Sequence, residues 1–166
     1  MKLFELTRGR IIRWSVFMVA ATVLYLGILR RFRYYRLGDG AEAMAPALVA
    51  GGRFLVDLEP ARRLERDWVV AWQPELGVLA YSRVVAVPGD SIVEQQGWAV
   101  RTSGGDTISL PAGLELRSPV RLARDEYFLL NDRPDVPRPD SRDTGPVPRE
   151  RIHVHILFPA GRGAVR

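Results

Sequence analysis

Apolar residues are distributed in two different ways along this chain, and the change divides it into two parts. Residues 11–29 (IIRWSVFMVAATVLYLGIL) form one long apolar run, in which Trp14 to Leu29 carries no charge. Nineteen helical residues at about 1.5 Å each span roughly 28 Å, which matches the hydrocarbon core of a membrane. Because the run is apolar all round, a core helix of a soluble protein explains it less well. The pattern predicts an N-terminal tail over 1–10, a single transmembrane helix over 11–29 and a further domain over 30–166.

After residue 30 the apolar residues occur only in short runs bounded by Gly, Pro and Asp. Such runs, rich in β-branched and aromatic side chains, are typical of strands. They predict strands at 54–56, 68–72, 84–87, 91–93, 98–100, 127–130 and 152–158. Pro60 to Arg66 is a candidate for one short helical turn with Pro near its start. The expected fold class is therefore mainly β, with an antiparallel sheet that is twisted or folded over.

The charge is also divided between the two parts. Residues 1–36 carry eight Lys or Arg and one acid, a net charge of +7, whereas residues 37–166 carry sixteen Arg and eighteen Asp or Glu, a net charge of −2. The basic excess thus flanks the apolar run, where it meets lipid phosphates, and it does not cover the globular part. We therefore expect membrane lipids as partners of residues 11–29 and no nucleic-acid partner. The chain has no cysteine, so disulfides and thiolate chemistry are excluded.

A cleaved signal peptide is the alternative to a membrane anchor. Ala41-Glu42-Ala43 matches a small-x-small cleavage site. However, Arg30, Arg31 and Arg33 directly follow the apolar run, which is a stop-transfer pattern. Four basic residues precede Trp14 and four follow Leu29, so the positive-inside rule does not decide the orientation.

Four segments, in order, resemble the conserved boxes of the type I signal peptidases, the membrane-bound serine/lysine proteases that remove export signals. Ala43-Met44-Ala45-Pro46-Ala47-Leu48 is similar to their Ser-Met-x-Pro-Thr-Leu box, and residues 66–72 (RDWVVAW) to their Gly-Asp-hydrophobic strand. Residues 82–90 (SRVVAVPGD) resemble the Lys-Arg-Val box that ends in Pro-Gly-Asp. Residues 127–132 (YFLLND), followed by 140–147 (DSRDTGPV), resemble the C-terminal box. The likeness covers roughly residues 30–160, and Asn131-Asp132 resembles the branch that processes conjugative pilins.

The positions that carry chemistry in that family differ here. The resemblance matches the nucleophilic serine to Ala43 and the general-base lysine to Ser82. It matches two helper serines to Ala41 and Arg138, or to Pro137 if the count starts from Phe128. The only lysine is Lys2, which lies before the apolar run and cannot reach the domain. A serine/lysine site needs a neutral amine beside a hydroxyl, so the resemblance implies a pseudoenzyme without catalytic residues. A substitution made to trap a substrate explains Ala43 alone but not all four changes.

The retained family residues have structural chemistry. Pro88-Gly89-Asp90 is a turn sequence, since Pro presets φ and Gly tolerates positive φ. The resemblance implies a scaffold ion pair between Asp140 and Arg142, which we expect among the charges that face Arg83. The complete set of retained scaffold positions is Met44, Pro46, Arg83, Pro88, Gly89, Asp90, Asp140, Ser141, Arg142 and Gly145.

A rebuilt active site is the competing interpretation. A serine triad would need His153 or His155 to approach Ser82 or Ser141. We expect the two histidines instead on one face of a strand at the sheet edge, and their spacing offers a metal no obvious third ligand. No cofactor and no metal site is predicted. Trp68, Trp72 and Trp98 are candidates for an apolar cleft or a membrane surface, with core packing expected for at least two of them.

These features predict a catalytically inactive, signal-peptidase-like protein of a bacterial inner membrane, with its β domain on the periplasmic side. Its partners would be other proteins of a membrane complex, in which it is a binding or structural subunit. It would alternatively hold extended peptide segments by strand addition, which needs no nucleophile. The remaining alternative is an active signal or pilin peptidase with a rebuilt or mutated site.

Overall fold

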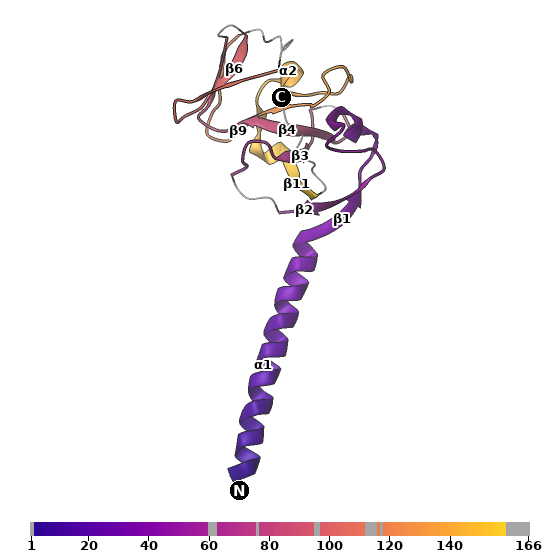
Figure 1. The fold of residues 1–166 in the computed structure, drawn as a ribbon, viewed down its shortest axis with the longest axis vertical. Coiled ribbons are helices and arrows are strands. Elements are labelled where there is room, and N and C mark those ends of the chain that lie inside the picture. The colour runs from indigo at the N-terminus through magenta and orange to yellow at the C-terminus, as the bar shows by residue number, and fades with distance from the viewer. Residues whose placement is uncertain are drawn as a thin grey trace. The chain divides into compact units, whose positions relative to one another are not determined.

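The computed structural model of the protein describes residues 2–59, 63–75, 77–94, 97–111, 116 and 118–158. By its internal contacts the chain separates into two compact units, residues 1–33 and residues 34–166. The first unit contains the N-terminal helix, and the second is the β domain (Figure 1).

Helix α1 (Lys2–Arg31) begins nine residues before the predicted transmembrane helix and includes residues 2–10 of the expected N-terminal tail. Its segment Arg10–Arg31 has a mean hydropathy of 1.9 and no share buried within the protein. By length and composition this helix is able to cross a membrane, a test that a signal sequence also passes.

The β domain contains a seven-stranded sheet in the order β1-β2-β11-β3-β4-β9-β10. Figure 1 shows β11, β3, β4 and β9 side by side. The strands are β1 (Phe32–Arg36), β2 (Arg53–Asp57), β3 (Val69–Trp72), β4 (Ala80–Ala86), β9 (Glu126–Leu130), β10 (Val147–Pro148) and β11 (Ile152–Phe158). The pairings of β2 with β11, β11 with β3, β3 with β4, β4 with β9 and β9 with β10 are all antiparallel.

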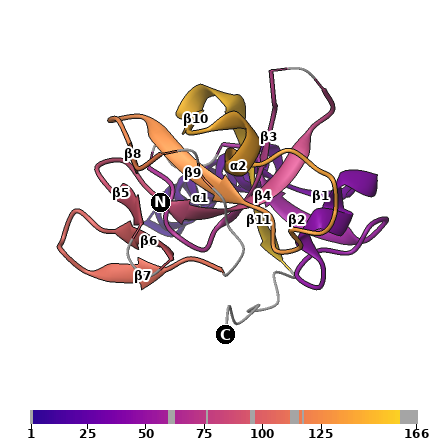
Figure 2. The ribbon, with the colours of Figure 1, turned by 90° about the horizontal axis from the view of Figure 1, so that it is seen from above.

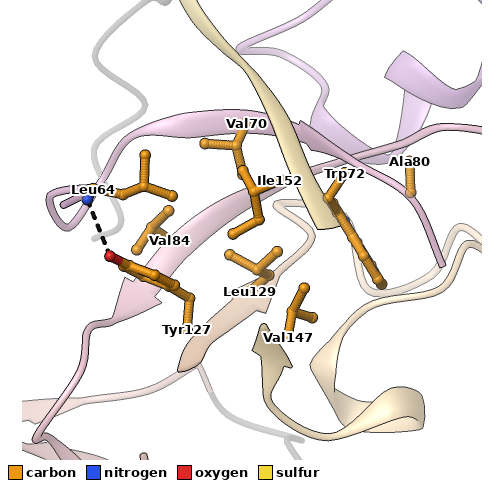
Figure 3. Packing of buried hydrophobic residues seen from close by; sticks show 9 residues of the cluster. All are labelled: Leu64, Val70, Trp72, Ala80, Val84, Tyr127, Leu129, Val147 and Ile152. Atoms are coloured by element: carbon orange, nitrogen blue, oxygen red, sulfur yellow. Dashed lines mark hydrogen bonds between the residues drawn. The ribbon is translucent and has the colours of Figure 1, made fainter. Parts of the chain in front are cut away.

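Both faces of this sheet are covered by apolar side chains. One face carries the core drawn in Figure 3, which contains Leu64, Val70, Trp72, Ala80, Val84, Tyr127, Leu129, Val147 and Ile152. The Tyr127 hydroxyl in this core accepts a hydrogen bond from the Leu64 backbone N–H at 3.2 Å. The other face packs against the 3-10 helix η1 (Asp39–Met44) through Ala41, Met44, Val56, Val69 and Ile156. The doubly covered central strands β3 and β9 are accordingly buried along nearly their whole length.

A second sheet of four strands has the order β7-β6-β5-β8 and lies at the opposite end of the β domain from β1 and β2 (Figure 2). Its strands are β5 (Ser91–Glu94), β6 (Trp98–Arg101), β7 (Thr107–Ser109) and β8 (Val120–Arg121). A third apolar core joins it to the first sheet, with Ile92 and Val100 on one side and Ala86 and Phe128 on the other. Two short helices, α2 (Ser141–Thr144) and η2 (Arg149–Arg151), complete the chain order between β9 and β11.

The prediction of a mainly β, antiparallel domain is confirmed, and each of the seven predicted strands coincides with an observed one. Three features differ. Residues 63–66 are not helical, and Pro60 to Arg62 lie outside the described residues. Strand β4 begins at Ala80, four residues before the predicted start. Strand β11, with both histidines, is interior to the sheet between β2 and β3, so the predicted edge position is wrong.

Candidate functional site

The candidate site lies at the start of β4, in the part of the strand that pairs with β3 and precedes the part that pairs with β9. Strand β9 pairs with β4 from Arg83 onward, so the first residues of β4 have no partner strand on that side. Helix η1 packs against β4, and the chain after β9 turns away at Asn131. Ser82 of β4, Ala43 of η1 and the loop that starts at Asn131 therefore meet in one small region.

The Ser82 side chain is fully buried and belongs to a chain of hydrogen bonds. Its Oγ accepts from the Trp72 indole Nε1–H at 3.0 Å and donates to Asn131 Oδ1 at 2.8 Å. Asn131 Nδ2 in turn donates to the backbone carbonyl of Arg138 at 3.0 Å. The indole can only donate and the carbonyl can only accept, so the direction of every bond in this chain is fixed.

This direction decides what the Ser82 hydroxyl is able to do. Its proton points to a carboxamide oxygen, which accepts a hydrogen bond but is not a general base at neutral pH. One of its two acceptor lone pairs is occupied by the indole N–H. The hydroxyl is thus held as a structural link between β3, β4 and the loop after β9.

Ala43 and Ala41, the positions matched to a nucleophile and a helper serine, are both fully buried. The Ala43 carbonyl accepts a hydrogen bond from the Arg133 backbone N–H at 2.9 Å. Arg133 lies two residues after Asn131, the hydrogen-bond partner of Ser82, so one loop binds both Ala43 and Ser82. The structure therefore brings the regions of Ala43 and Ser82 together, with a methyl group at one position and, at the other, a hydroxyl that already accepts one hydrogen bond and donates another.

Arg138, at the other helper position, contributes its backbone carbonyl to the hydrogen-bond chain. Any residue supplies that atom, so the presence of arginine there has no bearing on this contact. The nearby ion pair Arg133–Asp135 is exposed.

The Asp140-Ser141-Arg142 sequence completes the outer edge of β9. Strand β10 pairs with β9 only at Tyr127 and Glu126. Further along, the Leu129 N–H donates to Ser141 Oγ at 2.9 Å and the Asn131 N–H donates to Asp140 Oδ2 at 3.1 Å. These side chains replace a missing strand partner. Asp140 also caps α2 by accepting from the Arg142 N–H, and it pairs with the Arg142 guanidinium at 2.7 Å.

Arg83 does not face Asp140 or Arg142, which corrects the expectation from the sequence. Its guanidinium binds Asp132 through two hydrogen bonds of 2.8 and 2.6 Å. A third hydrogen bond of 2.9 Å goes to the Asp67 carbonyl, where the backbone has a φ of 68°. The bond to Asp132 raises the pKa of Arg83 and keeps the guanidinium charged. The predicted ion pair between Asp140 and Arg142 is present, at 2.7 Å.

Pro88-Gly89-Asp90 forms a turn, with Gly89 at a φ of 89° and the Asp90 N–H bonded to the Val87 carbonyl. The Asp90 carboxylate is fully buried and accepts two hydrogen bonds, of 2.8 and 2.7 Å, from one Arg66 nitrogen. It also accepts from the N–H groups of Val87 and Ser103. Met44 is buried in the core beneath η1, Pro46 is exposed just after it, and Gly145 ends α2 at a φ of 74°.

The two histidines have different surroundings, and among the described residues the hydrogen-bond partners of Ser82 and Ser141 include neither of them. His153 is exposed, whereas His155 is buried and stacks on Trp68 with a ring separation of 3.9 Å and an interplanar angle of 6°. Burial lowers the pKa of His155, and the charge of Asp57 on neighbouring strand β2 opposes that shift. Within the described part of the chain no three His, Asp or Glu side chains are grouped so as to hold a metal ion.

Trp72 and Asp132 are the site residues that sequence reasoning missed. Core packing was expected for at least two of the three tryptophans, and Trp72 is buried in one core, where its indole N–H also has a specific partner in Ser82. Trp68 and Trp98 are partly buried and pack against different cores. Asn131-Asp132 was a sequence signal, and its meaning is side-chain pairing: Asn131 binds Ser82 and Asp132 binds Arg83.

Comparison with known proteins adds no assignment: no family model matches the chain, and no curated protein matches it.

Proposed function

We propose that this chain is a non-catalytic, single-pass membrane protein of the signal-peptidase type, acting as a structural or binding subunit of a bacterial membrane protein complex. Helix α1 would anchor it in the cytoplasmic membrane, and the β domain would lie on the extracytoplasmic side. The apolar, unburied segment Arg10–Arg31 supports the anchor. The ordered sequence boxes support the family.

The observation that carries the proposal is the hydrogen-bond chain Trp72–Ser82–Asn131–Arg138. A nucleophile must be reached by its substrate and must lose its proton to a base. The Ser82 hydroxyl is fully buried and donates its hydrogen bond to an amide oxygen, which cannot take up its proton at neutral pH. Ala43, the residue matched to the nucleophile, has no hydroxyl and is equally buried.

The same burial argues against capture of an extended peptide in the former cleft, and it favours docking of a partner protein on the domain. Strand addition needs free main-chain groups at a sheet edge. Here the side chains of Ser141 and Asp140 already accept from the N–H groups of Leu129 and Asn131 along the outer edge of β9, and η1 packs against β4. We therefore place the binding role on the anchored domain as a whole and not on the former cleft.

The first experiment measures assembly. The tagged full-length chain is extracted from its native membrane in mild detergent and sized by native electrophoresis, with cross-linking before extraction. We expect a defined band larger than the monomer whose other components co-migrate with the tag. Recovery of a lone monomer with and without cross-linking contradicts the proposal.

The second experiment measures catalysis and distinguishes the active-peptidase alternative. Purified full-length protein is incubated with exported precursors and with pilin precursors, beside the variants Ser82→Ala and Ser91→Ala. We expect no cleavage by any of the three. Cleavage that Ser82→Ala abolishes and Ser91→Ala retains identifies a working site and overturns the non-catalytic role.

A further inference from the structure

The first half of α1 carries a group of side chains whose arrangement is more specific than crossing hydrocarbon requires. Arg10, Arg13, Trp14 and Phe17 line one shallow groove on the helix surface. They are spaced at i, i+3, i+4 and i+7, and at about 100° per residue they fall within an arc of about 100° on one helix face. Two cations and two aromatic rings thus share one side of the helix.

The arginines have no anionic partner in this part of the chain. No Asp or Glu occurs between Glu5 and Asp39. Arg10 and Arg13 are exposed, and within the described residues neither has an ion-pair or hydrogen-bond partner. Arg13 already lies inside the apolar run, one helical turn past the start of the segment able to span a membrane. A guanidinium at that depth needs a counter-charge, because an unpaired cation is costly near hydrocarbon.

The aromatic residues lie on the apolar side of this pair. Trp14 and Phe17 contact each other edge to face, with ring centroids 6.1 Å apart. Tryptophan is suited to the level of lipid headgroups, where its ring meets acyl chains and its N–H stays in a polar layer. The order along the helix is therefore guanidinium groups first and aromatic rings next, which matches the order of phosphate and acyl chain in a phospholipid.

We propose that Arg10, Arg13, Trp14 and Phe17 form a binding site for the phosphate headgroup of an anionic phospholipid. The inference rests on the proposed membrane-spanning role of α1. The two guanidinium groups bind the phosphate through paired N–H donors, and the rings pack on the first part of an acyl chain. A net negative headgroup is favoured over a zwitterionic one because nothing in residues 6–38 offers a negative charge to its ammonium group.

The test titrates the detergent-solubilised full chain with short-chain phosphatidylglycerol and, in parallel, with short-chain phosphatidylcholine, followed by calorimetry. Wild type is compared with Arg10→Gln/Arg13→Gln and with the matched control Arg30→Gln/Arg33→Gln, which removes the same charge at the other end of the helix. We expect wild type and the control to prefer phosphatidylglycerol. At about five- to sixfold per arginine, the double change at Arg10 and Arg13 should weaken that binding by roughly 30-fold. Arg10→Lys/Arg13→Lys should fall between, since lysine keeps the charge and loses the paired donors.

The lipid site is overturned if wild type binds the two lipids with equal affinity, or if both glutamine variants lose the same amount of affinity for phosphatidylglycerol. It is also overturned if inorganic phosphate competes at the concentration at which the lipid binds, because the site then belongs to free phosphate. Flotation of the same proteins with phosphatidylcholine vesicles is the separate readout for the anchor. We expect all variants to float. If wild type fails to float, the membrane-spanning role is wrong, whatever the titration gives.

Discussion

The two sheets of the β domain are built from similar residues, yet they hold their polar groups differently. Strands β3, β4 and β9 of the seven-stranded sheet are buried on both faces. The side chains of Ser82, Arg83 and Asn131 are buried beside them, and each forms hydrogen bonds to specific protein groups. The four-stranded sheet is more exposed along its strands, and its strand β7 is wholly exposed. A polar group inside the first sheet must therefore find a protein partner, whereas one on the second is solvated. The segments around Ser82 and Asn131 that resemble signal-peptidase boxes thus lie where a buried polar residue needs a specific protein partner.

Replacement of a tryptophan in each sheet should give the largest difference in stability between the two sheets. Trp72→Ala opens a cavity and removes the donor to Ser82, so we expect the free energy of unfolding to fall by about 3–5 kcal/mol. Trp98→Ala, at a half-buried ring on β6, should cost clearly less. The measurement is guanidinium unfolding of the full chain in detergent micelles, followed by circular dichroism. Equal costs would show that both sheets are packed to the same degree.

The ion pair between Arg66 and Asp90 links the sheets, since Arg66 precedes β3 and Asp90 precedes β5. Asp90→Ala leaves a guanidinium and two backbone N–H groups without their acceptor, and we expect a loss of about 3 kcal/mol. The matched control is Glu75→Ala, whose partner Arg151 is at the surface and whose effect should stay below about 1 kcal/mol. Hydrogen exchange should show β5 and β6 opening first in Asp90→Ala. Protection that decreases equally in both sheets argues against a link between them.

The hydrogen bonds of Ser82 should matter less than the packing of Trp72. Ser82→Ala keeps the fold but leaves the Trp72 N–H and the Asn131 oxygen unpaired, for an expected loss of about 1–3 kcal/mol. Ser91→Ala, on β5 of the four-stranded sheet, should change stability by less than about 0.5 kcal/mol. The same unfolding titration checks both. A neutral Ser82→Ala would mean that water replaces the hydroxyl and that the region is more open than the structure shows.

The smallest expected effect is a pH dependence from His155. Burial lowers its folded pKa below the ordinary 6.5, partly offset by Asp57, so the unfolded chain binds the proton more readily. The contribution of His155 is complete above pH 6.5 and is lost as the pH falls through the interval down to the folded pKa. His155→Gln should remove this part of the acid sensitivity, and His153→Gln should retain it. Identical pH profiles for wild type and His155→Gln would exclude a role for this group.

Sequence reasoning reached the strands through their apolar runs and missed those without one. Strand β7 (TIS) and strand β10 (VP) have too few apolar residues to produce a pattern, and β8 has only two residues. The early start of β4 at Ala80 was hidden because Ser82 and Arg83 interrupt the run, and only their buried partners explain polar residues there. His153 and His155 alternate as an edge strand would, but β11 is inserted between β2 and β3 by pairing with segments distant in sequence.

The sequence by itself determined that a helix able to span a membrane precedes an antiparallel β domain, because hydrophobic length and period follow from local residue order. It also determined that no lysine is present beyond Lys2. Only the tertiary structure decided the partners: Ser82 with Trp72 and Asn131, Arg83 with Asp132, and Asp140 with the free edge of β9. Those choices depend on which strands become neighbours and in which register, and no local pattern encodes which of several nearby carboxylates a buried guanidinium will reach.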